Sequence, residues 1–277
     1  MKVGYGTYGM PKLPVVDAIT AAAEIGYDGI ELACLPNGHA TPDKLDAAER
    51  RAIKAKFEEL GLELPALMLG LNAVADDLAP ELEKLKQACE LAQQLAIGAP
   101  PVLVSTTGGS WKQWEADQDR GADNIIKFAE VAGEAGLIFA LEPHVGGFVH
   151  RPEQAEYVRL RSGEMPSLQF NYDHSHFILQ NIPPEVAAPI MTPHAVATHL
   201  KCAEGDMEHV KFLLPGEGDF HYPAFVKLLD SLGYDGYLTC EVSGMIWNKP
   251  DYDPIEAAKF CYRTLSGAIE AAGVTRG

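Results

Sequence analysis

The feature that most restricts the fold is an alternation, along the whole chain, of eight short β-rich runs with longer amphipathic helical patterns. The runs lie at residues 2–6, 29–34, 62–69, 101–106, 137–143, 168–173, 195–201 and 236–242. Helical patterns are centred on residues 15–25, 41–60, 78–96, 115–135, 152–162, 184–190, 221–232 and 254–272. Such alternation favours a parallel sheet, and eight units in 277 residues match the size of a (β/α)8 barrel.

Helix boundaries are also visible in the sequence. In the second helical pattern Thr41 is a suitable N-cap, Pro42 suits the first helical position, and Gly61 can end the helix. The tetrapeptide GYDG occurs at 26–29 and again at 233–236, each time between a helical pattern and a strand. A glycine that stops a helix in a repeated βα unit would produce this pattern.

No linker rich in Pro or Ser and no block of charge divides the chain, so we expect one barrel domain over residues 1–277. An open doubly wound sheet is the alternative fold. The first strand is not followed by the G-x-G-x-x-G that typifies many such sheets, which favours the barrel.

The formal charge of −17 at pH 7 argues against nucleic acids and anionic membranes as partners, because it repels phosphate groups. A small neutral ligand or a cation fits better. The 5 cysteines are scattered and form no C-x-x-C pair, which predicts reduced core thiols rather than a disulfide framework or a thiolate zinc site. The N-terminus has no stretch of signal-peptide type and no apolar run of about 18 residues appears, so we expect a cytoplasmic protein.

Ligand-type side chains end the last four predicted strands. Glu142 ends the fifth strand, Asp173 the sixth, His199 the seventh and Glu241 the eighth. In a barrel the carboxyl ends of the strands meet at one mouth, where active sites form. Any one of these residues could be a polar strand end, but three carboxylates brought together would repel one another without a cation. The four therefore predict a site for one divalent metal, with Mn²⁺ preferred and Mg²⁺, Co²⁺ and Zn²⁺ as alternatives.

Several segments resemble a known family of barrels. They are GYDGIEL (26–32), LEPH (141–144), YDHSH (172–176), HLK (199–201), PGEGDF (215–220) and GYDGYLTCEV (233–242). With these segments the chain resembles the xylose isomerase-like barrels, which include ketose 3-epimerases, hydroxypyruvate isomerase, inosose dehydratase and endonuclease IV. The resemblance implies a single divalent metal on the same four strand-end residues, and it implies that His176 contacts metal or substrate. It leaves a homo-oligomer open.

The chain also departs from this family. Cys202 stands where an acid often follows H-x-K, and Lys211 is the nearest cation before PGEG, where relatives carry an arginine. The endonuclease branch needs additional histidines after the second and third strands; His39 follows the second strand here, but no histidine follows the third. With the negative charge as well, the resemblance implies a small sugar as substrate and no action on DNA. Glu217 stands between two glycines, and its negative charge would repel a phosphate group. A nonphosphorylated sugar is therefore expected.

The predicted chemistry is proton transfer next to a carbonyl. A metal bound by sugar oxygens polarises the carbonyl and acidifies the adjacent C–H, so a carboxylate can remove that proton and leave a metal-stabilised enediolate. Glu142 and Glu241 come from strands far enough apart to face each other across a ligand, and either can be the base. The sequence thus predicts an isomerase or epimerase of a small sugar or keto-sugar. The alternative is a dehydratase or lyase acting on an inosose-like or 3-keto-sugar substrate, including a 3-keto-glycoside, with His144 or His176 as the acid. A sugar-binding barrel without turnover is a third interpretation, against which the two glutamates count.

Further residues are candidates for substrate contacts. His144 lies two residues beyond Glu142 and can act as a second acid or base or bind a hydroxyl; a surface loop is the other interpretation. Lys201 shares a strand face with His199 and can meet a carbonyl or a carboxylate, or pair with Glu204 or Asp206. Glu217 can bind substrate or only turn the chain. Candidates of lower rank are Trp111 and Trp247, which can stack on a sugar or cover the core, and His174, for which we expect a structural role. Glu31 can enter the barrel beside the ligands, although a lone strand glutamate more often caps a barrel end or pairs with a lysine.

Overall fold

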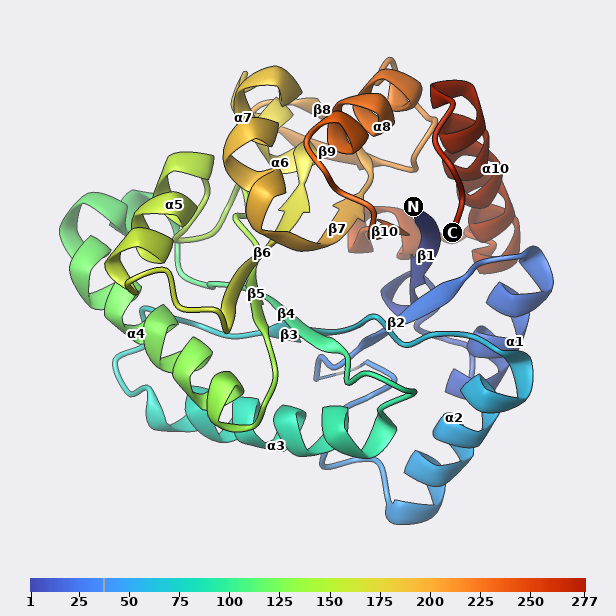
Figure 1. Ribbon diagram of the computed structural model, residues 1–277, viewed down its shortest axis with the longest axis horizontal. Coiled ribbons are helices and arrows are strands. Elements are labelled where there is room, and N and C mark those ends of the chain that lie inside the picture. The colour runs from blue at the N-terminus through green and yellow to red at the C-terminus, as the bar shows by residue number, and fades with distance from the viewer. Residues whose placement is uncertain (37) are drawn as a thin grey trace.

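The computed structural model describes residues 1–36 and 38–277. Eight parallel strands close into a barrel in the order β1-β10-β7-β6-β5-β4-β3-β2 (Figure 1). They are β1 (Lys2–Gly6), β2 (Gly29–Ala33), β3 (Ala66–Gly70), β4 (Val102–Thr106), β5 (Phe139–Leu141), β6 (Leu168–Asp173), β7 (Ala195–Leu200) and β10 (Tyr237–Cys240). The predicted (β/α)8 barrel is confirmed, with each strand close to its expected run.

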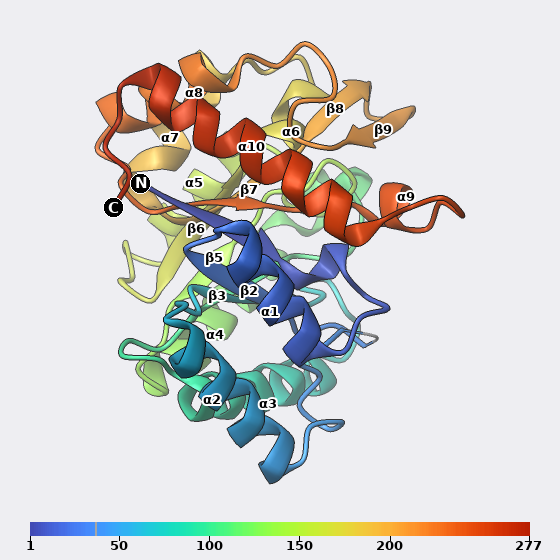
Figure 2. The same cartoon turned by 90° about the vertical axis from the view of Figure 1, so that its right-hand side faces the viewer.

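Long helices surround the barrel, as Figures 1 and 2 show. They are α1 (Val15–Ile25), α2 (Ala47–Leu60), α3 (Ala79–Leu95), α4 (Trp114–Glu134), α5 (Pro152–Arg161), α7 (Pro184–Met191), α8 (Tyr222–Ser231) and α10 (Pro254–Ala272). Short helices lie in the loops: α6 (His174–Ile178), α9 (Gly244–Trp247), η1 (Thr7–Gly9), η2 (Trp111–Gln113) and η3 (Thr192–His194). The two ends of the chain meet, and the amide of Gly277 donates to the carbonyl of Met1 at 3.0 Å (Figure 2).

The hydrophobic core lies mainly between the outer face of the barrel and the helices, where large aliphatic and aromatic side chains pack. Inside the barrel the packing is different. A layer of small side chains, from Ala66, Val104, Ala140 and Ala197, fills its interior. Along β5, β6 and β7 the inward-facing positions repeat every second residue, so the next inward positions toward the mouth are Glu142 and His199.

The two GYDG segments do what the sequence predicted. Gly26 ends α1 with φ of +110° and Gly233 follows α8 with φ of +86°. Only glycine adopts such conformations without strain, so each segment can turn from a helix straight into a strand. In the described part of the chain no helix is long and apolar enough to cross a membrane.

The start of α2 was predicted wrongly. The helix begins at Ala47, where Asp46 accepts from the amide of Glu49 and the Glu49 carboxylate accepts from the amide of Asp46. This capping box outcompetes the Thr-Pro pair, because two amides are satisfied at once. The hydroxyl of Thr41 instead donates to the carbonyls of Leu35 and Gly38 in the preceding loop.

An antiparallel hairpin after β7 was not predicted either. It consists of β8 (Cys202–Gly205) and β9 (Val210–Leu213). Its sequence has few β-branched residues, so the strand pattern is weak. The hairpin is held by packing instead, since Phe212 is buried against Val145 and Leu179. Phe212 also lies edge-on to His176, with ring centroids 5.4 Å apart, so the hairpin covers one side of the barrel mouth.

Candidate metal centre and active site

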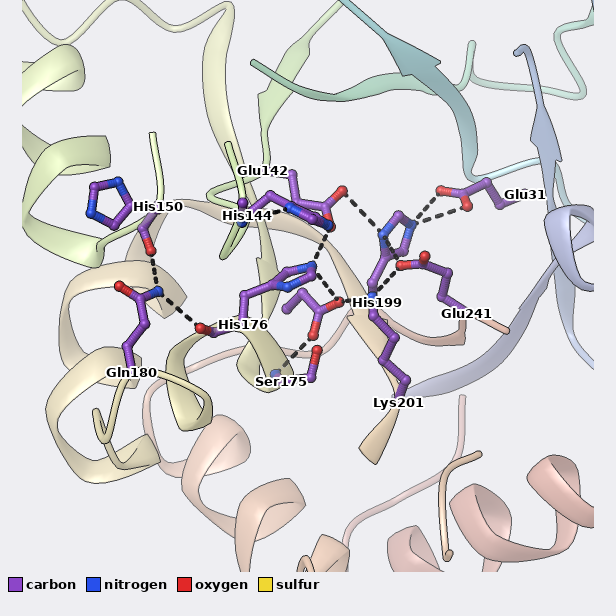
Figure 3. A network of polar contacts seen from close by, with 12 residues as sticks. Glu31, Glu142, His144, His150, Ser175, His176, Gln180, His199, Lys201 and Glu241 are labelled. Atoms are coloured by element: carbon purple, nitrogen blue, oxygen red, sulfur yellow. Dashed lines mark hydrogen bonds and ion pairs between the residues drawn. The ribbon is translucent and has the colours of Figure 1, made fainter. Parts of the chain in front are cut away.

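Four side chains from neighbouring strand ends converge at the carboxyl end of the barrel, and three of them, Glu142, His199 and Glu241, are labelled in Figure 3. Glu142, Asp173, His199 and Glu241 are all buried, and each offers one ligand atom such that these atoms lie within 4.8 Å of one another. The register of the sheet explains the convergence, because Asp173 pairs with His199 and His199 with Thr239, two residues before Glu241. We name this group the strand-end cluster.

The orientation of the His199 ring is set by Glu31, which enters the barrel from β2. The Nε2 of His199 lies 3.0 and 2.9 Å from the two carboxylate oxygens of Glu31. Because a carboxylate only accepts, Nε2 carries the hydrogen and donates it. The other ring nitrogen, Nδ1, then faces Glu142 at 3.3 Å and Glu241 at 3.1 Å, as Figure 3 shows. A carboxylate behind an imidazole in this way is typical of metal-binding histidines.

The surroundings of His199 favour a positive charge at its ring. Burial alone would lower the pKa of His199, but the charges of Glu31 and Glu142 outweigh burial and hold that pKa well above its ordinary value. Nδ1 has no hydrogen-bond partner among the described residues. The space between Nδ1 and the two glutamates would therefore suit a cation, either a proton or a metal ion.

Lys201 supplies one positive charge to the cluster. Its side chain is 2% exposed, and its ammonium hydrogen-bonds the carboxylate of Asp173 and, at 2.6 Å, that of Glu241. Burial would lower the pKa of Lys201, but the two carboxylates outweigh burial and raise it. Lys201 thus meets the carboxylates of the strand-end cluster and not Glu204 or Asp206. Its predicted contact with substrate stays a prediction.

The donor set fits a divalent cation. Four buried carboxylates, from Glu31 and the cluster, carry about four negative charges, and Lys201 compensates one of them. Oxygen donors together with one imidazole nitrogen suit Mn²⁺, Mg²⁺, Co²⁺ or Zn²⁺. Glu142, Asp173, His199 and Glu241 would hold the ion, with Glu31 orienting His199.

Two histidines border the cluster on the side of β5 and β6. The Nε2 of His176 lies 3.4 Å from both Glu142 Oε1 and Asp173 Oδ2. The ring of His144 packs on that of His176, with centroids 4.0 Å apart. Burial, reinforced by His176, lowers the pKa of His144 to about 3, so His144 is neutral. Its Nδ1 accepts from the amide of Gly146, which leaves the hydrogen on Nε2.

The other predicted contact residues lie at differing distances from this centre. Glu217 is exposed, and its carboxylate accepts from the amide of Leu214 at 2.9 Å, where it closes a turn. Trp111 lies edge-on to His150 at 6.3 Å between centroids. Trp247 lies edge-on to Tyr8 at 5.5 Å. The roles predicted for these three residues in substrate binding stay predictions.

His174 is separated from the cluster although it follows Asp173. It points away from the barrel interior and stacks on Phe220, with centroids 4.0 Å apart. Burial lowers the pKa of His174 to about 3. A neutral imidazole packed among aromatic rings is a structural residue.

Sequence reasoning missed Tyr8, which lies in η1 directly after β1. Burial raises the pKa of its hydroxyl, and the charge of Glu241 raises it further while Lys201 opposes the change. The charges of Glu241 and Lys201 therefore both act on this hydroxyl. The available signal was an aromatic residue two positions after the first strand, in GYGTYG.

Comparison with known proteins identifies the family. The family profile described as xylose isomerase-like TIM barrel matches residues 19–263. The chain belongs to this family. Its relatives include fructoselysine 3-epimerase of Escherichia coli O157:H7, 25% identical over 267 residues that cover 90% of this chain and 93% of the relative. They also include 2-oxo-tetronate isomerase of Cupriavidus necator, 26% identical over 256 residues that cover 85% and 92%.

Solved structures agree on the fold of this xylose isomerase-like barrel. The crystal structure of the IOLI protein with a bound zinc atom superposes with a TM-score of 0.81 at 16% identity, covering 99% of this chain and 98% of that one. The relatives above act as an epimerase and an isomerase of sugar-type substrates, which supports an enzymatic role for this chain.

Proposed function

We propose that this protein is a divalent-metal-dependent isomerase or epimerase of a small, nonphosphorylated sugar or keto-sugar. The observation that carries the proposal is the pocket at His199, whose Nδ1 faces Glu142 and Glu241 while Glu31 holds the opposite nitrogen. A binding protein needs no such arrangement of two carboxylates around a cation site. The activities of the epimerase and isomerase relatives support the same reaction class.

A divalent ion bound there would polarise a substrate carbonyl and stabilise the negative charge that develops on its oxygen during proton removal. Mn²⁺ is our choice, on the grounds of three carboxylate ligands and one imidazole. The zinc named for the IOLI protein structure supports the binding of a divalent ion by a barrel of this fold.

Glu142 and Glu241 transfer the proton in this proposal. Burial would raise both pKa values, but His199 outweighs it at Glu142, and Lys201 together with His199 lowers the pKa of Glu241 to about 2. Both carboxylates are therefore ionised and able to accept a proton. They approach His199 Nδ1 from two strands, so one can remove a proton from one face of a bound sugar and the other can return it to the opposite face.

The remaining neighbours hold and shield the substrate. Lys201 reaches both Asp173 and Glu241 and can donate to a substrate oxygen beside them. Phe212 packs within 5.1 Å of the Lys201 ammonium and covers it from solvent. Such shielding strengthens electrostatic interactions at the reacting carbon.

The test is hydrogen exchange. Manganese-loaded protein is incubated in D₂O with a panel of ketoses, inososes and 3-keto-glycosides, and the recovered substrates are analysed by mass spectrometry. Deuterium on a carbon next to the carbonyl supports the proposal. Glu241→Gln should slow exchange at least 10³-fold, since it removes the acceptor. Glu204→Gln is the matched control, because Glu204 is exposed and pairs with Lys211. Full exchange in the Glu241 variant would refute the assigned role.

Elimination is the second candidate, favoured by one observation. The neutral His144 carries its hydrogen on Nε2 and packs on His176, which borders Glu142. Such a group can donate a proton to a departing hydroxyl or alkoxide. Loss of water or of an aglycone in the same incubations, abolished by His144→Phe, would assign the protein to the lyases.

A further inference from the structure

A cavity of about 270 Å³ opens at the barrel mouth on the side of β1, β2 and β10. Thr7 and Ala33 line its barrel side. The walls include Tyr8, Trp247, Leu35 and Pro11. Tyr8 and Trp247 meet edge to face, so the wall they form is rigid and aromatic.

The cavity continues the candidate active site. Ala33 lies two residues beyond Glu31 on β2 and so shares its inward face, one layer closer to the mouth. Glu31 binds His199, and the hydroxyl of Thr7 accepts from the amide of Ala33. A Cβ on Gly6, the residue before Thr7, would lie 3.2 Å from Glu31 Oε1. The barrel side of the cavity is therefore the next layer above the pair formed by Glu31 and His199.

Tyr8 connects the cavity wall with the other side of the cluster. Its hydroxyl would lie 3.4 Å from a Cβ on Gly244, three residues after Glu241. A ring carbon of Trp247 would lie 3.4 Å from the same Cβ position. Gly244 thus allows both rings to close over the end of β10. A group attached to a sugar in the strand-end cluster would reach the cavity along Tyr8.

The cavity carries no charge. Of the described residues that line it, none is an Asp, Glu, Lys or Arg. His39, at its edge, has its pKa lowered by burial and donates Nε2–H to the carbonyl of Leu13, so its ring is neutral. The barrel mouth beside this cavity contains four carboxylates, and the whole chain has a formal net charge of −17. An anionic group would be repelled, and a cationic group would find no carboxylate to pair with among the lining residues.

We infer that this cavity binds an uncharged, apolar ring attached to the keto-sugar, so that the substrate class is a keto-glycoside with an aryl or similar aglycone. The inference rests on the proposed function, because it assigns the sugar to the strand-end cluster. Flat aromatic and prolyl walls match a planar ring, and a volume of about 270 Å³ accommodates one ring but not a long chain.

The test compares aglycones on one sugar. Binding of methyl, phenyl and 2-aminoethyl 3-keto-β-D-glucosides to the manganese-loaded protein is measured by calorimetry, and deuterium exchange is followed in parallel. The phenyl compound should bind at least tenfold more tightly than the methyl compound, and the aminoethyl compound should bind no better than methyl. Trp247→Ala and, as a second variant, Leu35→Ala should each reduce the phenyl-to-methyl ratio at least fivefold.

Met245→Ala is the matched control, since Met245 lies in the same short helix as Trp247 but is 53% exposed, and it should leave the ratio unchanged. Equal binding of phenyl and methyl compounds, a preference for aminoethyl, or no binding of any of the three would overturn the inference. Exchange without phenyl preference would leave the proposed reaction standing and remove the cavity's role. A preference for phenyl without deuterium exchange in any compound would support the cavity's role and contradict the proposed reaction.

Discussion

Removing the charge of Lys201 should tighten metal binding. The ammonium hydrogen-bonds Asp173 and Glu241, both members of the strand-end cluster, the second at 2.6 Å. An ion among ligand atoms that lie within 4.8 Å of one another would stand about 4 Å from this ammonium. At an effective dielectric constant of about 20, two unit charges at that distance repel by about 4 kcal/mol, and a dication doubles the value to about 8 kcal/mol.

The lysine stem is flexible and can carry the ammonium away from a bound ion, so only part of this repulsion remains. For Lys201→Met, which keeps the length of the side chain, we expect a gain of about 1.4 to 3 kcal/mol, or roughly 10- to 100-fold tighter binding of Mn²⁺. The metal-free variant should be less stable by about 3 kcal/mol, because two buried carboxylates lose their partner.

Calorimetric titration of Mn²⁺ into the metal-free protein measures the first effect, and chemical denaturation in the presence of a chelator measures the second. Lys201→Arg is the control, since it retains the charge and should bind metal as the wild type does within a few fold. Equal or weaker metal binding by Lys201→Met would show that the ammonium and the ion do not share Asp173 and Glu241, and the reasoning would fail.

Two further predictions concern other parts of the molecule. Glu31→Gln should weaken metal binding about 10- to 100-fold without removing a ligand, because His199 loses the carboxylate that orients it; the same titration checks this, and unchanged affinity would contradict the role of Glu31. Burial lowers the pKa of His174 to about 3 in the folded protein. As the pH falls below about 6.5, this histidine therefore becomes protonated in the unfolded chain but stays neutral in the folded chain. The free energy of unfolding should therefore drop between pH 7 and pH 5 by about 2 kcal/mol more in the wild type than in His174→Phe, as followed by urea denaturation, and parallel pH profiles would contradict the assignment.

The location of the candidate site was predictable from the sequence for a simple reason. Parallel strands of a barrel all end at one mouth, so a ligand-type residue at the end of each strand is enough to bring them together. Glu142, Asp173, His199 and Glu241 are such residues, and the structure places their ligand atoms within 4.8 Å of one another. The GYDG helix stops were equally readable, because a positive φ leaves little choice but glycine.

Contacts that depend on packing were not predictable in the same way. The hairpin of β8 and β9 has a weak strand pattern and is stabilised by the packing of Phe212 against Val145 and Leu179. The start of α2 depended on a competition between two capping signals, which propensity alone did not decide. Tyr8 escaped notice because its loop approaches Glu241 from a strand distant in the sequence.

By itself the sequence determined the barrel and the mouth at which four ligand-type side chains meet, since these follow from local periodicity and from which residue ends each strand. Only the tertiary structure decided that Glu31 binds His199 across the barrel, that Lys201 lies between Asp173 and Glu241, and that an uncharged cavity adjoins them. Those contacts depend on the register between strands and on loop packing, because these bring together side chains that are far apart in the sequence.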